Sequence, residues 1–521
     1  MNHTQKVMFN SIILYTKIII TMLISLVSVP MILRALGKSD YGLYNLIAGV
    51  ISMLSFLKSS MSITTQRYLS VAMGENNNDK LNTIYNVSLI LHFIVGLIIV
   101  LLFEICYLFI FDGFLNIEPD RIHAAKIVYQ FIVASTFFSI ISVPFGAVMN
   151  AKENMLAFSI IAIIDSILKL ILAFYLSRCS FDRLIIYGGC IALISFMNII
   201  FNQIYVRIKY KEFKIRPIKF FNKDYFIKML GFSGWNTLGA VAMIGRNQGV
   251  AVIFNLFCGT VANAAYGIAH QINGVLGYFS STFQRALNPQ LMQSEGMNNR
   301  SRLINLALKT VFNNTGYIAL KSSKYSVWVI ALFAIPLIIE MPYVLKLWLK
   351  DVPEYTLQLS QLVLVLAIVY QHSVGLMSSI QAVGKIRNYF ITISILILLN
   401  LPICYFILKN GFPLHYCIIV FIIIEFISLI TRLFMAHKIV GIRIKDFVMK
   451  VFLPNILCII AGGLVAMIFH FLMEESFLRV VFVSMSYLFV YLVIAWCFVF
   501  DIQIKRIVLS IKNRFINFLK R

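Results

Sequence analysis

The sequence alternates between long apolar runs and short polar connections. About fourteen such runs predict membrane-spanning helices, near residues 10–33, 41–65, 83–111, 122–149, 155–177, 184–206, 229–257, 261–287, 322–345, 356–381, 389–408, 415–437, 451–471 and 478–500. At 1.5 Å per residue, about 20 residues cross the roughly 30 Å of hydrocarbon in a bilayer. Prolines inside these runs predict kinks rather than ends, because membrane helices tolerate them. These are Pro30, Pro144, Pro336 and Pro402. The pattern predicts an all-α polytopic membrane protein.

Composition supports the same fold class. Hydrophobic residues make up 60% of the 521 residues and charged residues only 13%. A soluble domain is about 25% charged, and a soluble core could not enclose this much apolar surface. The eight cysteines are scattered singly, so the sequence predicts neither a disulfide framework nor a zinc site. No metal or cofactor is expected from any motif.

The net charge of +24 predicts the orientation of the chain. About 30 Lys and Arg residues lie in both termini and in the even-numbered connections, against about 10 in the odd-numbered ones. Basic residues are retained on the cytoplasmic side. We therefore expect both termini in the cytoplasm and a bacterial cytoplasmic (inner) membrane as the location.

Two basic segments lie outside the predicted spans. The linker, residues 207–228, is rich in Lys and Arg and divides the spans into six and eight. We expect it to be solvated and to touch anionic lipid headgroups. The tail, residues 501–521, places apolar residues on one helical face and lysines elsewhere, which predicts an amphipathic helix on the inner leaflet.

An internal repeat organises the chain. Residues 41–50 (YGLYNLIAGV) match 266–275 (YGIAHQINGV), 66–69 (QRYL) match 284–287 (QRAL), and 74–81 match 296–303. The second copy begins six spans after the first. Because six is an even number, both copies enter the membrane in the same direction, as in a parallel repeat. The predicted organisation is a six-helix bundle (1–206), the linker, a second six-helix bundle (229–445) and two extra helices (446–500). A central cleft would lie between the bundles.

Motifs for catalysis are missing from the sequence. It contains no P-loop, G-x-S-x-G or HExxH pattern, and the predicted outer loops are short. A membrane enzyme that assembles glycans would need a large outer loop with catalytic groups. Transport without ATP hydrolysis is the function class that the sequence favours.

Several polar and basic residues fall inside spans of the repeated hairpins. Ionisable groups in a membrane are costly and usually face a bundle interior or a cavity. Lys and Arg bind phosphate oxygens through charge-assisted hydrogen bonds, so these residues predict a cationic cavity for a phosphate-bearing substrate. The candidates are Arg246, Lys17, Lys58, His270, Gln271 and Asn273. Two alternatives are snorkelling of the lysines to headgroups, and a buried pair of Arg246 with Asp165 or Glu425.

Acidic residues inside spans have two interpretations. Asp165 and Lys169 are four residues apart and can pair on one helical face. Glu425 lies near the middle of its span, with Arg432 on the same face. Each carboxylate either forms a structural pair or couples transport to H⁺ or Na⁺. Glu340, near an outer end, is expected at the membrane interface.

The opening of the chain, FNSIILY followed by VPMILRALGKSDYGLYNLIAGVISML and TTQRYLS, resembles a known family. It is similar to the O-antigen and capsular polysaccharide flippases of the multidrug/oligosaccharidyl-lipid/polysaccharide (MOP) exporter superfamily. The correspondence centres on the turn from Arg34 to Tyr44. The resemblance implies that basic residues of spans 1, 2, 7 and 8 line a cavity that receives a pyrophosphate; Lys17, Lys58 and Arg246 are similar in helix and depth.

The function implied is a flippase that moves an undecaprenyl-pyrophosphate-linked oligosaccharide across the cytoplasmic membrane by alternating access. Expected partners are this lipid-linked oligosaccharide, membrane lipids, H⁺ or Na⁺, and other glycan-assembly proteins; nucleic acid is not expected. A cation-coupled drug or small-solute exporter of the same superfamily is the second interpretation. A glycan ligase or polymerase is the third.

Overall fold

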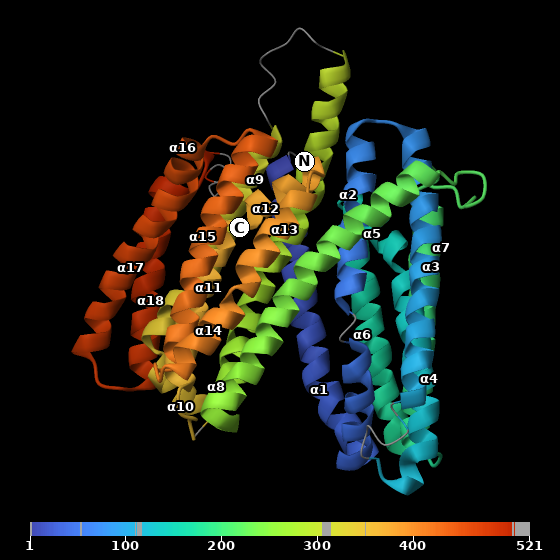
Figure 1. Ribbon diagram of the computed structural model, residues 1–521, viewed down its shortest axis with the longest axis horizontal. Coiled ribbons are helices and arrows are strands. Elements are labelled where there is room, and N and C mark those ends of the chain that lie inside the picture. The colour runs from blue at the N-terminus through green and yellow to red at the C-terminus, as the bar shows by residue number, and fades with distance from the viewer. Residues whose placement is uncertain are drawn as a thin grey trace, which may run out of the picture. The chain divides into compact units, whose positions relative to one another are not determined.

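The computed structural model describes residues 3–52, 55–109, 111, 117–304, 314–349, 351–502 and 505, and the regular secondary structure in these residues is helical. It divides into an N-terminal unit, Asn10–Thr237, and a C-terminal unit, Leu238–Arg521 with Met1–Phe9. The N-terminal helices are α1 (His3–Ser52), α2 (Ser55–Gly74), α3 (Asn78–Phe109), α4 (Ile122–Ile141), α5 (Val143–Ala151), α6 (Met155–Arg178) and α7 (Arg183–Lys209) (Figure 1). A 3₁₀ turn, Pro119–Arg121, precedes α4.

The C-terminal helices begin with one long element that starts in the N-terminal unit. They are α8 (Lys223–Ile304), α9 (Asn314–Ile339), α10 (Met341–Leu349), α11 (Thr356–His372), α12 (Val374–Val383), α13 (Arg387–Leu398), α14 (Asn400–Lys409), α15 (His415–Val440), α16 (Ile444–Phe447), α17 (Leu453–Leu472) and α18 (Phe477–Ile494). Short π-helical segments, Val448–Phe452 and Ala495–Val499, precede α17 and follow α18.

Within the described residues, 12 helices are long and apolar enough to cross a membrane. The predicted all-α, polytopic fold class is therefore confirmed. One of the 12 candidates, Lys223–Met297, has 75 residues, more than three times the length that a single crossing requires. It is bent at Gly259. The predicted total of fourteen crossings stays a prediction.

Two glycines occupy equivalent places in the repeat. Gly37 bends α1 with φ 79° and ψ 169°, and Gly259 bends α8 with φ 74° and ψ −169°. This backbone region is essentially restricted to glycine, because a Cβ atom would clash with the chain. Each glycine lies between the first and second predicted spans of its half. The repeat thus extends from matched sequence to matched backbone conformation.

A second pair of matched features lies further along each half. Helix α4 is interrupted at Ser142 before α5, and α11 is interrupted at Ser373 before α12. Eleven residues after each serine the backbone becomes left-handed, at Glu153 (φ 56°) and Gly384 (φ 92°). Both halves keep these features in the same order along the chain. This order agrees with a parallel repeat.

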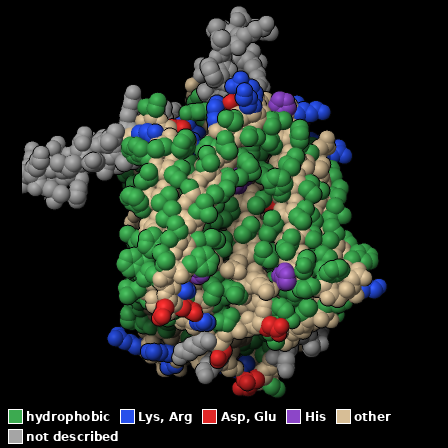
Figure 2. All heavy atoms as spheres, turned by 90° about the vertical axis from the view of Figure 1, so that its left-hand side faces the viewer, with side chains coloured by type: hydrophobic (Ala, Val, Ile, Leu, Met, Phe, Trp, Pro, Cys, Tyr) green, Lys and Arg blue, Asp and Glu red, His purple; other side chains and the backbone are tan. Residues whose placement is uncertain are grey.

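The helices of each unit pack in corresponding pairs. In the N-terminal unit α4 packs on α3 and α7, and in the C-terminal unit α11 packs on α9 and α15. Helices α17 and α18 pack on each other and on α9. Their outer sides carry exposed apolar residues such as Leu464 and Phe489, and Figure 2 shows that hydrophobic side chains dominate this face between its charged ends. Such a face suits contact with lipid tails.

Glu340 ties α17 and α18 to the end of α9. Its carboxylate is fully buried and accepts hydrogen bonds from His470 Nδ1 at 2.8 Å and Arg479 Nε at 3.1 Å. The position of Glu340 at the membrane interface stays a prediction. The side chain can be withdrawn from the protein surface because two basic partners on neighbouring helices satisfy it.

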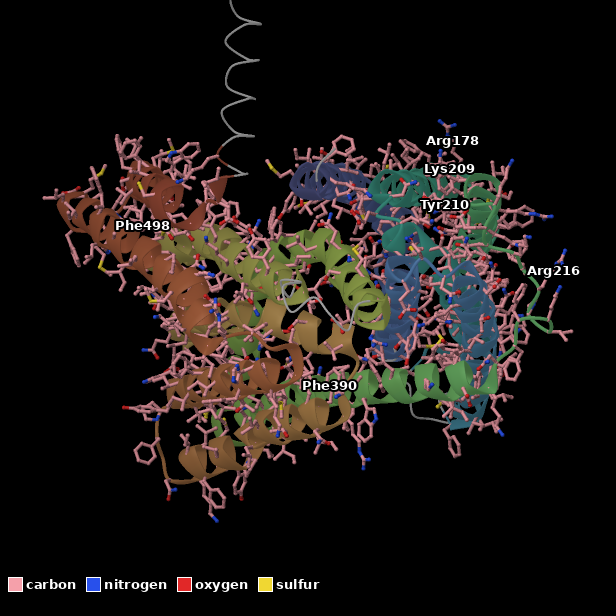
Figure 3. The ribbon with its side chains drawn as sticks, turned by 90° about the horizontal axis from the view of Figure 1, so that it is seen from above. Arg178, Lys209, Tyr210, Arg216, Phe390 and Phe498 are labelled. Atoms are coloured by element: carbon pink, nitrogen blue, oxygen red, sulfur yellow. The ribbon has the colours of Figure 1, made fainter. Side chains whose placement is uncertain are left out.

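The linker is partly packed rather than fully solvated. Asn86 on α3 donates to the Lys214 carbonyl and accepts from the Arg216 amide, both at 2.8 Å. Tyr210 and Phe213 are buried, whereas Arg216 points away from the helices (Figure 3). The expectation of a solvated segment therefore fails for Tyr210 and Phe213 and for the backbone groups that Asn86 binds, whereas the basic side chains of this half are exposed.

Glu212 lies within this packed part of the linker and forms an ion pair with Lys152, whose Nζ is 2.7 Å from Glu212 Oε1. Partial burial is the largest single effect and raises the pKa of the Glu212 carboxyl. The hydrogen bond and the positive charge of Lys152, together with a backbone hydrogen bond, outweigh burial and keep this pKa below its ordinary value. The predicted amphipathic tail lies outside the described residues, apart from Asp501, Ile502 and Lys505.

Candidate functional site

The C-terminal unit contains a group of polar and ionisable side chains inside its helices, which we call the C-terminal polar cluster. It draws on both limbs of α8 and on α11, α13 and α15, with Ser373 from the break between α11 and α12. Its members are Arg246, Tyr266, His270, Tyr370, Ser373, Tyr389, Glu425 and Arg432.

Glu425 and Arg432 form the centre of this cluster. Their side chains are each 3% exposed, and Arg432 Nη1 bonds to Glu425 Oε1. The same nitrogen donates to Ser373 Oγ at 2.8 Å, and the guanidinium lies 5.8 Å from the Tyr370 ring centre. The two residues are seven apart on α15, so they share a face and long side chains can join them. The pair compensates both charges inside the unit.

Arg246 is buried beside this pair but has a different environment. The residue is 7% exposed, and its guanidinium bonds to Asn247 Oδ1 at 2.9 and 3.1 Å. It also lies 5.1 Å from the ring centre of Phe421. Among the described residues, no carboxylate oxygen lies within 4.0 Å of it; Glu425 is within electrostatic range only. Arg246 therefore has polar and aromatic contacts but no counter-ion at contact distance.

His270 and Tyr266 lie on the second limb of α8, within electrostatic range of Arg246. Their ring centres are 4.3 Å apart, with an edge-to-face angle of 74°. The Tyr266 hydroxyl is buried and has no hydrogen-bond partner among the described residues. His270 is half-buried. Of the two other candidates on this limb, Gln271 is exposed and Asn273 is half-buried.

The N-terminal unit holds the remaining candidates. Lys58 is exposed and bonds to Ser139 Oγ on α4, within electrostatic range of Asp165 and Lys169. Asp165 and Lys169 form the pair that their spacing predicts, at 2.7 Å. Lys17 lies on α1, and its ammonium is 5.4 Å from the ring centre of Phe158 on α6. The unit thus brings Lys58, Asp165 and Lys169 into electrostatic range of one another, whereas the recorded contact of Lys17 is with Phe158.

One polar contact recurs in both halves and was not found from the sequence. In the N-terminal unit Lys58 reaches Ser139, three residues before the break at Ser142. In the C-terminal unit Ser280 donates to Gln371 Oε1 at 2.8 Å, two residues before the break at Ser373. Both contacts join the second span of a half to its fourth span. The signal that could have revealed Ser139 is its place beside a helix interruption, where polar side chains can satisfy freed backbone groups.

The structure therefore places two groups of predicted residues within electrostatic range. Arg246 and His270 form one group in the C-terminal unit, and Lys58, Asp165 and Lys169 form the other in the N-terminal unit. The predicted single cavity between the two bundles stays a prediction. In the part of the chain that is described, no group of three or more His, Cys, Asp or Glu residues could hold a metal ion.

The fold has known counterparts among membrane transporters. It is similar to a MATE mutant (TM-score 0.70) and to an outward-facing multidrug resistance MATE family transporter of the MOP superfamily (TM-score 0.68). It is also similar to a MOP superfamily transporter from Pyrococcus furiosus (TM-score 0.66), whose reversed binding-pocket polarity is said to suggest a different function. Each is 13% identical and is matched over 85% of this chain and 96–97% of its own. The fold is that of the MOP-superfamily transporters.

The sequence identifies the family. Residues 7–295 match the polysaccharide biosynthesis protein family, and the chain belongs to it. No curated protein matches the sequence. The resemblance predicted from the opening motif is thus confirmed at the level of family and superfamily fold.

Proposed function

We propose that this protein is a flippase for an undecaprenyl-pyrophosphate-linked oligosaccharide in the bacterial cytoplasmic membrane. Alternating access would carry the pyrophosphate and sugar through the protein while the prenyl tail stays in lipid. Family membership supports a role in polysaccharide assembly, and the fold supports transport. The sugar unit would come from other glycan-assembly proteins in the cytoplasm.

The main support for this proposal is that Arg246 is buried without a carboxylate at contact distance among the described residues. An unpaired charge at the centre of a membrane helix costs at least about 2.5–3.5 kcal/mol. Arg246 is buried, and the nearest buried carboxylate, Glu425, is already bonded to Arg432. A structural ion pair therefore does not account for it. A guanidinium can bind phosphate oxygens with two parallel hydrogen bonds, and a diphosphate would supply the missing negative charge.

The second candidate is a cation-coupled exporter of drugs or small solutes. The fold is shared with multidrug transporters, and Glu425 is a buried carboxylate that such a protein could use. However, both carboxylates that we considered for ion coupling, Asp165 and Glu425, have a basic partner within 4.0 Å. The uncompensated charge in the C-terminal polar cluster is positive, which favours an anionic substrate.

Substitution of Arg246 tests the proposal in a strain that lacks its own flippase. Arg246→Ala should abolish surface glycan while the amount of folded protein in the membrane stays normal; Arg246→Lys should retain part of the export. Lys346→Ala is the matched control, because Lys346 is a surface cation paired with Glu475. Surface glycan is measured by antibody or lectin binding, and folded protein by fluorescence size-exclusion chromatography.

Two outcomes would contradict the proposal. Full export by a well-expressed Arg246→Ala variant would remove its strongest support. A low folded yield that is restored by also substituting Glu425 would assign Arg246 a structural role instead.

A further inference from the structure

His270 differs from the buried histidines of the chain. His92 and His372 are buried and bond through Nδ1 to a carbonyl of their own helix, at 2.7 and 2.9 Å. His470 is fixed by Glu340. The ring nitrogens of His270 have no hydrogen-bond partner among the described residues, and its only ring contact is with Tyr266. Its nitrogens are free to bind a proton or a ligand.

The charges around His270 determine whether its protonated, positively charged form is favoured. Arg246 is within electrostatic range, so an imidazolium at His270 would repel an existing positive charge. No carboxylate lies within 4.0 Å of His270 in the described residues to offset this. The groups beside His270 are Tyr266, on its own limb, and Arg246, on the first limb of α8. Arg246 is in turn within electrostatic range of Tyr370 on α11 and of Glu425 and Arg432 on α15.

An anion changes this balance. A diphosphate bound to Arg246 places negative charge beside the His270 ring, so repulsion of the imidazolium becomes attraction. An unperturbed histidine changes charge near about pH 6.5, so a bound anion that favours the imidazolium can bring this change into the physiological range. Because Glu425 is held by Arg432, His270 is the group of the C-terminal polar cluster whose charge can respond.

We propose that His270 and Arg246 bind the substrate diphosphate together, and that His270 takes up one proton when the diphosphate binds. This inference rests on the proposed flippase function and extends it. Proton and anion then bind cooperatively, each raising the affinity for the other by the same factor. While the diphosphate is bound, the positive imidazolium of His270 would offset one of its negative charges in the low-dielectric interior. The buried, unbonded Tyr266 hydroxyl, which contacts the same ring, is available as a neutral donor to the same anion.

Binding of farnesyl diphosphate to the full-length protein in lipid nanodiscs tests this proposal. Wild-type affinity should rise by about tenfold, relative to His270→Gln, as the pH falls from 8.0 to 5.5, within the five- to 150-fold range typical of coupled sites. The comparison between variants removes the titration of the ligand itself. The control His123→Gln, an exposed histidine at the start of α4, should behave as the wild type.

Proton uptake gives an independent readout. Calorimetry in two buffers with different ionisation enthalpies should show about one proton bound per diphosphate near pH 7 in the wild type, and a fraction of this in His270→Gln. An equal pH dependence in wild type and His270→Gln, or no proton uptake in the wild type, would overturn the inference while leaving the flippase proposal intact. If Arg246→Ala binds as tightly as the wild type, the proposed substrate site itself is wrong.

Discussion

The buried pair of Glu425 and Arg432 allows a quantitative test of how charge is balanced in the C-terminal unit. Glu425→Gln removes the carboxylate but keeps the side-chain volume. Arg432 then remains 2% exposed, and its contacts with Ser373 (2.8 Å), the ring of Tyr370 and Tyr389 are all with neutral groups. Breaking a buried pair by removing one partner costs about 3–5 kcal/mol, because the other charge is left uncompensated.

The remaining hydrogen bond to Ser373 places the expected loss at the lower end, about 3 kcal/mol. For domains of this size, about 1 kcal/mol corresponds to roughly 2 °C, so the melting temperature should fall by about 6 °C. The double variant Glu425→Leu/Arg432→Met removes both charges together. It should recover to within about 1 kcal/mol of the wild type, because an apolar pair of similar volume avoids the desolvation cost.

A second ion pair in the same protein serves as the matched control. Asp165 and Lys169 have a similar separation, but their side chains are 24% and 45% exposed. Removal of the Asp165 carboxylate leaves Lys169 at the protein surface rather than buried among helices, so Asp165→Asn should lower the melting temperature by less than Glu425→Gln does. Thermal unfolding in detergent, followed by tryptophan fluorescence, measures all three variants. The reasoning fails if Glu425→Gln and Asp165→Asn have equal effects, or if the double variant is as unstable as Glu425→Gln.

Two further predictions concern packing and topology. Gly375→Ala should destabilise the protein by about 3 kcal/mol, since a Cβ there would lie 2.0 Å from a backbone carbonyl oxygen of α9. Gly277→Ala, where nothing lies within 4 Å, should be neutral or slightly stabilising in the same unfolding assay, and equal effects would disprove the close approach. For topology, Ser39→Cys and Lys409→Cys should react with a membrane-impermeant maleimide added outside cells, whereas a cysteine in the linker should not. The reverse labelling pattern would place the termini outside.

The apolar pattern alone determined the helical, membrane-spanning character of this chain. A lipid-crossing helix must satisfy its backbone internally and present about 20 apolar residues, so the signal is local and can be read along the sequence. Two of the predicted kinks also follow from local chemistry. Pro144 and Pro402 lie in the first turns of α5 and α14, directly after interruptions of the preceding helices. The sequence repeat likewise indicated the matched hairpins that Gly37 and Gly259 now define in the backbone.

The partner of each charged side chain was decided only by the tertiary structure. Arg246 lies by Phe421 of α15, and Glu340 is enclosed by His470 and Arg479, although these residues are more than 120 positions apart in sequence. Such contacts depend on how each helix is rotated about its axis and which neighbour it meets, and hydropathy carries neither quantity. Only pairs on one helical face, such as Asp165 with Lys169, could be predicted, because the helical repeat alone brings them together.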